Sequence, residues 1–205
     1  MSGTTTKKEP PMIEYPSLSS IPLKSAQDIV WQMLMHAAHE NDLEQVKANS
    51  LLQPYAQDFG QQKGDIGVGA ITKKQEDDEV VPIGAAWVRF LPGVGFATAH
   101  LKQKDGHDND NKPEFQMVLE LPELAIACLP EYRGMGVGSS LLKRLFEVVQ
   151  QEKGGYKGIC LSCRSDNPAL RLYERVGFVN VEGSELTNRA GGTSLTLMYL
   201  FDKKE

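Results

Sequence analysis

The 205-residue sequence has little cysteine, more acidic than basic side chains, and no long apolar run. No apolar stretch approaches the roughly 20 residues that a membrane-spanning helix requires, so the sequence predicts no membrane partner. The 22 Lys and Arg against 27 Asp and Glu give a formal net charge of −5, which argues against a nucleic-acid partner. What is present, 40% apolar and 24% charged residues, is typical of one globular α/β domain.

Three cysteines form no disulfide pattern, which suits a reducing compartment. The segment 1–11 lacks the apolar core of a secretory signal, so we expect a cytoplasmic protein. Cys160 and Cys163 form a C-x-x-C, but they fall in a predicted strand, where residues three apart point to opposite faces. Because none of the four histidines has other potential metal ligands near it in the sequence, we expect no bound metal.

The patterning predicts a flexible tail with a first strand over residues 1–24 and a single domain over 25–205. The segment Ser25-Ala-Gln-Asp28 resembles a capping box and predicts a helix from there to residue 40. The segment 91–113 reads as a long polar loop. A second helix is expected at 42–49 and a further turn near 52–58. Strands are expected at 66–72, 82–90, 115–128 (interrupted at Pro122) and 159–164, with two more at the end of the chain. The glycine-rich segment is expected to lead into a helix ending near 152, and another helix is expected to begin at 167.

The most informative segment lies in the second half of the chain, where an apolar run ends at Pro130 and a glycine-rich turn follows. Apolar residues then recur at helical spacing, at Val137, Leu141, Leu142, Leu145, Phe146 and Val149. The order strand, glycine loop and helix aims the free N–H groups of a helix N-terminus at open space. This arrangement suits an anion, and a ligand with phosphate groups above all.

Three kinds of glycine loop compete for this segment. A P-loop ends in Gly-Lys-Ser/Thr, whereas Gly138 is followed by Ser139 and Ser140. A dinucleotide loop needs G-x-G-x-x-G and an acid at the end of the next strand, but the chain has G-x-G-x-G and no acid until Asp166. The third pattern, Arg/Gln-x-x-Gly-x-Gly/Ala, fits Arg133-Gly-Met-Gly-Val-Gly138 at every position. Here the sequence resembles the GCN5-related N-acetyltransferase (GNAT) superfamily, whose loop holds the pyrophosphate of acetyl-coenzyme A (acetyl-CoA).

A second motif follows about 30 residues later, Asn167-Pro-Ala-Leu-Arg-Leu-Tyr-Glu-Arg-Val-Gly-Phe178. Asn167 is a helix N-cap, Pro168 takes the first helical position and Gly177 ends the short helix. The superfamily has a helix of this form, Asn-x-x-Ala-x-x-Leu-Tyr-x-x-x-Gly-Phe, at the same place. Two motifs in the right order strengthen the resemblance, which is strongest over residues 84–201 and, near the end of the chain, points to an uncharacterised bacterial-type subgroup.

The resemblance implies an α/β (α+β) fold with a mixed, mostly antiparallel sheet, splayed middle strands and flanking helices. It implies transfer of an acetyl group from acetyl-CoA, as co-substrate and without a metal, to an amine of a small molecule or peptide. By resemblance, the end of the central strand and the loop after it hold acetyl-CoA. These residues are Ile126, Ala127, Cys128, Arg133, Gly134, Met135, Gly136, Val137, Gly138 and Ser139, with Asn167 and Tyr173 added from the second motif.

The chemistry of acyl transfer suggests roles for a few of these groups. A tyrosine can protonate the leaving thiolate, and Tyr173 matches the superfamily's position for that acid. The Cys128 N–H is the candidate to polarise the thioester carbonyl. By resemblance, the amine is deprotonated by a glutamate on the central strand. Glu123 and Glu120 are the candidates, and Pro122 obscures the strand register that would decide between them.

Two alternatives remain open at this point. One is a non-catalytic acyl-CoA-binding or sensor protein on the same fold, and the other is a regulator that binds ATP or NAD at the glycine loop. The acceptor, the acyl length and the oligomeric state, a homodimer included, are not encoded in these motifs.

Overall fold

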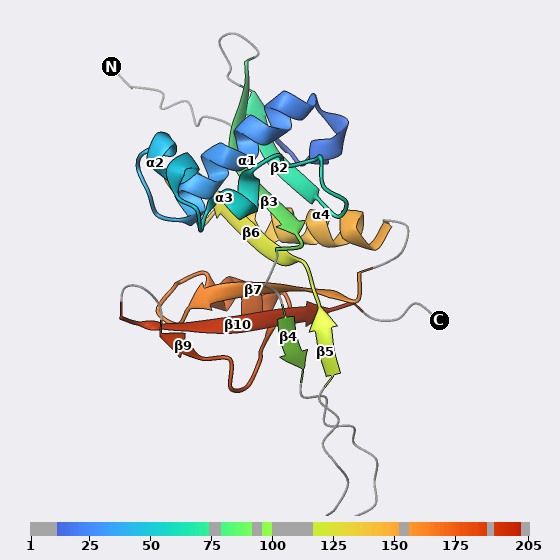
Figure 1. Cartoon of the computed structure of the whole chain (residues 1–205). Helices are drawn as coiled ribbons and strands as arrows, with labels where there is room; N and C mark the ends of the chain where they lie inside the picture. The colour runs from blue at the N-terminus through green and yellow to red at the C-terminus, as the bar shows by residue number, and fades with distance from the viewer. Residues whose placement is uncertain are drawn as a thin grey trace, which may run out of the picture.

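The computed structural model of the chain describes residues 12–73, 79–91, 96–99, 117–151, 156–187 and 191–201. In this part, the main sheet has its strands in the order β1-β2-β3-β6-β7-β10-β8, with β9 on β10, and β4 and β5 form a separate small sheet. All recorded strand pairs are antiparallel except β6 with β7 (Figure 1). The predicted mixed, mostly antiparallel sheet with flanking helices is confirmed.

The elements follow the predicted order closely. The strands are β1 Ile13–Glu14, β2 Ile66–Lys73, β3 Val80–Arg89, β4 Phe96–Ala99, β5 Met117–Glu120, β6 Glu123–Cys128, β7 Gly158–Arg164, β8 Val179–Asn180, β9 Leu186–Thr187 and β10 Thr193–Leu200. The helices are α1 Leu23–Ala37, α2 Leu43–Ala48, α3 Gln53–Ala56, α4 Val137–Gln151 and α5 Leu170–Arg175, with short 3-10 turns at Leu18–Ser20 and Pro130–Tyr132.

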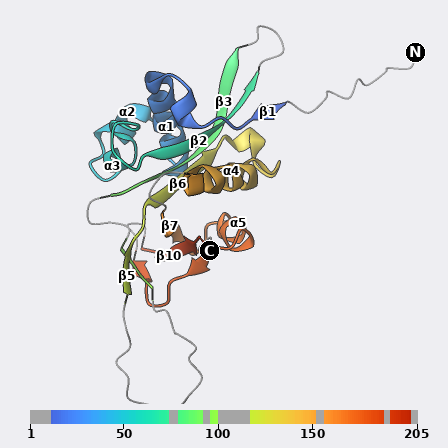
Figure 2. The same ribbon diagram turned by 90° about the vertical axis from the view of Figure 1, so that its right-hand side faces the viewer.

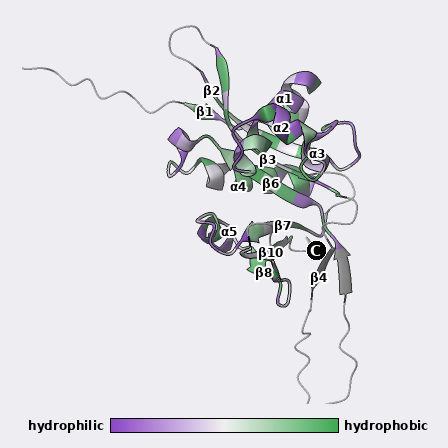
Figure 3. Ribbon diagram, turned by 60° about the vertical axis from the view of Figure 1, so that its left-hand side comes forward, coloured by the Kyte–Doolittle hydropathy of each residue, from purple (hydrophilic) through white to green (hydrophobic). Residues whose placement is uncertain are grey.

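Helices cover both faces of the sheet. The helices α1, α2 and α3 pack on one face of β3 and β6, and α4 packs on the other face (Figure 2). All six apolar residues predicted for the inner side of α4 are buried. Coloured by hydropathy, the strands between the helices are the most apolar part of the molecule (Figure 3). We call the two sides of the sheet the α4 face and the α1 face.

The sheet divides between β6 and β7. The two strands run parallel, and their only recorded register pair is Glu123 with Cys160, although every residue of both strands is described. Beyond that pair the strands diverge, so the sheet has one half with β1, β2, β3 and β6 and another with β7, β8 and β10 (Figure 1). We call this divergence the β6–β7 split. It confirms the expected splayed middle strands.

Pro122 interrupts the predicted strand 115–128, as expected, because proline has no N–H for a strand ladder. Among the described strands the two pieces belong to different sheets, since β5 pairs with β4 and β6 belongs to the main sheet. On the far side of the break, Glu123 pairs with Arg89 of β3 and Ala125 and Ala127 are buried on the α1 face. Because side chains alternate along a strand, the Glu123 side chain belongs to that same face.

Three local predictions need correction. The capping box is wrong: α1 begins at Leu23 after Pro22, so Ser25 lies inside the first turn and no side chain caps the helix. The helix also ends at Ala37 rather than at residue 40, and His39 follows in the left-handed conformation. The loop prediction for 91–113 is wrong at Phe96–Ala99, which pairs with β5, a partner about 20 residues away. Residues 92–95 and 100–116 lie outside the described part.

The N-terminal segment contains the expected first strand. β1 pairs with β2, and Leu18 is only 2% exposed within the core on the α1 face. The described residues before Ser25 therefore pack as part of the folded domain, and residues 1–11 lie outside the described part.

The C-x-x-C residues occupy opposite faces of β7, as predicted. Cys163 belongs to the core cluster on the α4 face, whereas Cys160 packs with Leu121, Val181 and Met198. All three cysteines are free. The pair is therefore not a redox or metal motif in this fold.

Candidate active site

The glycine loop between β6 and α4 exposes bare main chain. Gly134 and Gly136 have φ angles of 76° and 85°, in the left-handed region that glycine alone adopts without strain. A Cβ atom placed at either position would meet no described atom within 4 Å. Glycine is required here by conformation, and a ligand could approach the main chain of both residues.

The N-terminus of α4 lies directly after these two glycines. The Ser140 N–H donates to the Gly136 carbonyl at 3.0 Å, which closes the first helical turn. The N–H groups of residues 137–139 therefore have no acceptor one turn back, and they form the positive end of the helix. Gly138 differs from these two glycines, because a Cβ there would lie 3.0 Å from the end of the Leu172 side chain on α5.

Two arginines flank this helix end. The Arg133 Nε donates to the Cys128 carbonyl at 3.4 Å, and an Arg175 guanidinium nitrogen lies 3.3 Å from the Ser139 Oγ. Both arginines are exposed. The glycine loop thus combines free N–H groups with two cations, which is the composition of an anion site.

The edge of β6 turns main-chain groups toward the split. The Leu129 N–H donates to β3, and the Pro122 carbonyl accepts from β7. Main-chain groups alternate in direction along a strand, so the N–H groups of Ile126 and Cys128 point away from β3. This edge can pair with an extended, amide-bearing ligand.

The Asn167 segment brings a tyrosine to the α4 face. The Asn167 Oδ1 accepts from the Ala169 N–H at 2.9 Å, a turn that precedes α5. The helix itself begins at Leu170, two residues after the predicted Pro168. Tyr173 is 8% exposed, in the same apolar cluster as Cys163 of β7. Burial raises the pKa of Tyr173, and Cys163 adds to that effect, so the phenol keeps its proton at neutral pH.

Glu123 is a buried carboxylate at the vertex of the split, with 5% of the residue exposed. Burial raises the pKa of this carboxyl group, and hydrogen bonds from the Tyr55 side chain and the Ser162 main chain oppose that effect. The Tyr55 Oη lies 2.7 Å from Oε1. A carboxylate whose pKa is raised toward neutral pH is suited to accept a proton.

Comparison with known proteins gives the family. The family model described as an acetyltransferase (GNAT) domain matches residues 75–180, more than half of the chain. The chain belongs to the GNAT acetyltransferase family. A curated relative, the [ribosomal protein bS18]-alanine N-acetyltransferase of Haemophilus influenzae, is 40% identical over 57 residues. That match covers 28% of this chain and 38% of the relative's length.

Solved GNAT-fold structures share the architecture at low sequence identity. The NatC complex bound to Gag peptide and CoA includes a chain with a TM-score of 0.55 and 17% identity, over 93% of this chain and 99% of that one. Arabidopsis thaliana NAA60 in complex with acetyl-CoA has a TM-score of 0.54 and 16% identity, over 93% of this chain and 99% of that one. The Escherichia coli ribosomal-protein-S18-alanine N-acetyltransferase has a TM-score of 0.51 and 16% identity, over 95% of this chain and 99% of that one. These likenesses establish the fold.

The structure separates the two glutamates that the sequence could not rank. Glu120 is exposed at the end of β5, outside the main sheet, whereas Glu123 is buried beside the split.

The pieces expected around acetyl-CoA are brought to one region: the β6 edge, the glycine loop and α5. Met135 is an exposed residue of that loop, at 51%. Ala127 is buried on the α1 face, and by the same alternation its main-chain groups point toward β3 rather than toward the strand edge.

Sequence reasoning missed the residues that surround Glu123. Tyr55 belongs to α3, 68 residues from Glu123 along the chain, and no motif links the two. Arg89 is 2% exposed and forms a two-bond ion pair with Asp65, at 2.8 and 2.7 Å. An arginine inside the apolar β3 sequence was the only available signal, because a buried charge requires a partner.

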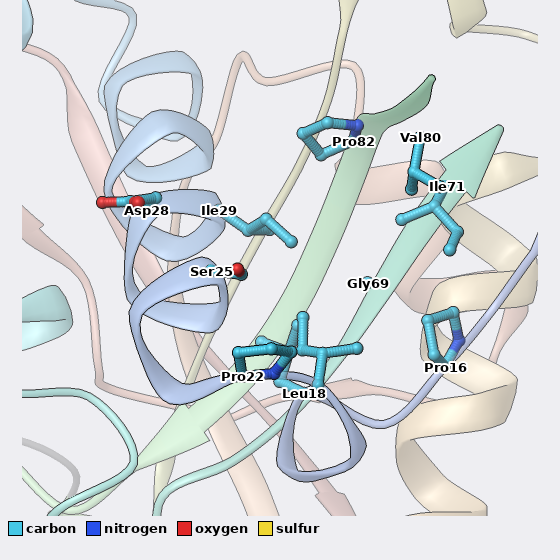
Figure 4. Close-up of a pocket in the computed structure, with 11 residues that line it drawn as sticks. Pro16, Leu18, Pro22, Ser25, Asp28, Ile29, Gly69, Ile71, Val80 and Pro82 are labelled. Carbon is cyan, nitrogen blue, oxygen red and sulfur yellow. The ribbon is translucent and has the colours of Figure 1, made fainter. Parts of the chain in front are cut away.

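A separate pocket of about 410 Å³ lies on the α1 face, near the free edge of the sheet. Leu18, Ile29, Gly69 and Pro82 are among its largely apolar lining (Figure 4). The polar Ser25 and Asp28 also line it. None of the predicted site residues contributes to this pocket.

No helix among the described residues is long and apolar enough to cross a membrane. No group of three or more His, Cys, Asp or Glu in the same residues could hold a metal ion.

Proposed function

We propose that this GNAT protein transfers the acetyl group of acetyl-CoA to an amine of a small molecule or peptide. The observation that carries the proposal is the bare glycine loop at the N-terminus of α4, placed at the end of a strand whose edge faces the β6–β7 split. Membership in an acetyltransferase family supports the same reading.

The donor would be held by the α4 face. Free N–H groups at residues 137–139 and the open space at Gly134 and Gly136 fit a pyrophosphate, and Arg133 and Arg175 supply positive charge. The N–H groups of Ile126 and Cys128 fit the amides of the pantetheine arm. Asn167 is committed to its turn through Oδ1, which leaves its side-chain NH₂ for the arm.

The acid and the base would reach the reaction from opposite faces of the sheet. Acetyl-CoA supplies the acetyl group as a thioester. Glu123, on the α1 face, takes the proton of the amine directly or through a water molecule. Tyr173, on the α4 face, keeps its proton until the thiolate leaves and then donates it. The nitrogen–carbon bond forms as the carbon–sulfur bond breaks, without a covalent enzyme intermediate.

The position of the oxyanion donor follows from the length of β6. Cys128 and Glu123 are its two ends, about 16 Å apart at about 3.3 Å per residue. The thioester carbonyl therefore cannot lie beside both Cys128 and Glu123. Ile126 lies three residues after Glu123 on β6, and Cys163 lies three residues after Cys160 on β7, so the two occupy matching positions on the parallel strands. Tyr173 belongs to the same apolar cluster as Cys163. We therefore assign the oxyanion donor to the Ile126 N–H, with Cys128 serving the pantetheine arm.

The acceptor class to test first is a peptide N-terminus. The relatives named above include ribosomal-protein-S18-alanine N-acetyltransferases and a complex with a bound peptide. Small amines such as polyamines, aminoglycosides and free amino acids complete the panel.

The deciding experiment is release of free thiol from acetyl-CoA by the full chain, with each amine and without amine. We expect tight binding of acetyl-CoA by calorimetry and release accelerated by at least one amine class, with mass spectrometry locating the acetyl group on nitrogen. Tight binding with no acceleration across the panel would support the non-catalytic acyl-CoA-binding alternative. Stabilisation by ATP or NAD but not by CoA would contradict the proposal outright.

A further inference from the structure

We infer that Tyr55 is a positioning residue for Glu123, which fixes the carboxylate at the vertex of the β6–β7 split and stabilises its charged form. The inference deepens the proposed function, since it concerns the candidate base. The contact itself, an O–H···O hydrogen bond of 2.7 Å, is independent of that function.

The main chain that carries Tyr55 is held in place on both sides. The Arg89 guanidinium donates to the carbonyls of Pro54 and Gln57, at 2.9 and 2.8 Å. The Trp87 Nε1 donates to the Tyr55 carbonyl at 2.8 Å. The helix α3 has only four residues, too few to be stable alone, so these bonds from β3 determine where Tyr55 lies.

The anchor is itself buried and neutralised. Arg89 and Asp65 form a two-bond ion pair in which each side chain is 2% exposed, and the guanidinium lies 5.8 Å from the centre of the Phe59 ring. A buried pair of this kind resists separation because either charge alone in the interior is costly. The α3 segment is therefore a fixed support for Glu123 rather than a movable cover.

The carboxylate lies between two elements. The Tyr55 hydroxyl donates to it from α3, and the Ser162 main chain on β7, two residues after the Glu123–Cys160 pair, favours its charged form. The Tyr55 bond therefore fixes the Glu123 carboxylate at the vertex of the split.

Among the groups around Glu123, the carboxyl group of Glu123 is the one that changes charge at the lowest pH. Burial, helped by Glu123, raises the pKa of Tyr55 and also raises the pKa of Cys160, to about 12. Arg89, its partner on β3, is bonded to Asp65, and the buried side chains of α1 on this face are apolar. Both Tyr55 and Cys160 thus keep their protons while Glu123 changes charge.

The sign of the expected effect follows from the hydrogen bond. The Tyr55 hydroxyl stabilises the charged carboxylate, which lowers the pKa that burial raises. In Tyr55→Phe the carboxylate loses that donor and keeps its burial. We expect the pKa of Glu123 to rise by about one to two units. Since a base works only when deprotonated, the acidic limb of the pH–rate profile should move to higher pH by the same amount.

The experiment measures the carboxyl group itself and the reaction. Carbon-13 NMR of glutamate-labelled full chain, with Glu123→Gln used to assign the signal, gives the titration of Glu123 in wild type and in Tyr55→Phe. The profile of kcat/KM against pH is recorded for the same proteins. Tyr15→Phe, which packs against the core on the α4 face, is the matched control and should leave both curves unchanged.

The outcomes separate this inference from the proposed function. An unchanged Glu123 titration in a folded Tyr55→Phe protein overturns the inference, even if Glu123→Gln abolishes activity. A raised pKa with a fully active Glu123→Gln keeps Tyr55 as the partner of Glu123 and removes Glu123 as the base. A raised pKa, a shifted acidic limb and an unchanged KM for acetyl-CoA support both.

Discussion

The two sides of the β6–β7 split are built in different ways. The loop side, made of residues 133–139 and α5, is open: two glycines face empty space, and its polar contacts are few. The base side, made of Glu123, Tyr55 and the β3 side chains that hold α3, is closed, and each of its side chains has a partner. The glycine loop and the Asn167 segment are each local in sequence, whereas the bonds to Arg89 and Glu123 span 24 to 68 residues.

This difference bears on function. An open anion site with bare main chain can serve a donor common to a whole family, because any chain that presents the same glycines can bind the same phosphates. A closed, cross-linked site depends on side chains from several distant elements. We infer that the loop side tells which donor the protein uses and that the base side differs more among relatives. Five substitutions can break or sharpen this comparison.

The largest effect is expected on the loop side from Gly136→Glu. The new side chain would place bulk and negative charge in the open space over the loop, in a backbone conformation that strains any residue but glycine. Binding of acetyl-CoA, measured by calorimetry, should be lost. Gly183→Glu is the matched control, since Gly183 has a φ of 75° and equally open surroundings. Equal affinity in both variants would remove the loop from the binding site.

Glu123→Gln tests the base side next. A general base contributes about 100-fold to 10,000-fold, so kcat should fall by that order while the affinity for acetyl-CoA stays the same. In wild type, the rate should rise with pH through a pKa above the ordinary value of 4.5, because burial raises the pKa of Glu123. Glu120→Gln, exposed on β5, should behave as wild type. The reverse result would exchange the two assignments.

Arg89→Met asks whether the base side depends on its anchor. Removing one partner of a buried ion pair leaves Asp65 uncompensated, which costs about 3–5 kcal/mol of unfolding free energy. Urea denaturation measures this loss. Arg164→Met, at the exposed pair with Asp166, should leave the denaturation midpoint unchanged. A stable Arg89→Met protein with normal kcat would show that the α3 segment does not need its anchor.

Tyr173→Phe tests the acid on the loop side. We expect kcat to fall by about 100-fold, the lower end for acid catalysis, because a thiolate leaves without much help. In wild type, burial raises the pKa of Tyr173, so activity should persist to pH values above the ordinary tyrosine pKa of 10. Tyr199→Phe, within the same aromatic cluster, is the control. An unaltered rate in Tyr173→Phe would assign the acid elsewhere.

The smallest effect is expected from Arg175→Ala. This exposed cation lies 3.3 Å from Ser139 at the start of α4, and its removal should raise the KM for acetyl-CoA about threefold to tenfold at low salt. The difference should shrink as ionic strength rises, because salt screens exposed charges. Arg171→Ala, exposed on the same helix, should have no such salt-dependent effect. Persistence of the effect at high salt would point to packing rather than charge.

Much of the fold followed from short-range patterns. The α4 helix was predicted residue by residue because its six buried positions repeat at helical spacing, and Pro122 marked a break because proline cannot continue a ladder. Errors arose where local signals met a tertiary partner. Pro22 starts α1 before the expected cap, and Phe96–Ala99 forms a strand only because β5 pairs with it.

By itself, the sequence determined the loop side: the glycine spacing, Arg133 and the Asn167–Tyr173 helix lie close enough in the chain to act as motifs. Only the tertiary structure decided the base side. It turned Glu123 inward at the vertex and Glu120 outward on another sheet, and it brought Tyr55 to the carboxylate from 68 residues away. The physical reason is that a backbone conformation is encoded locally, whereas the partner of a buried charge is selected by packing across the whole chain.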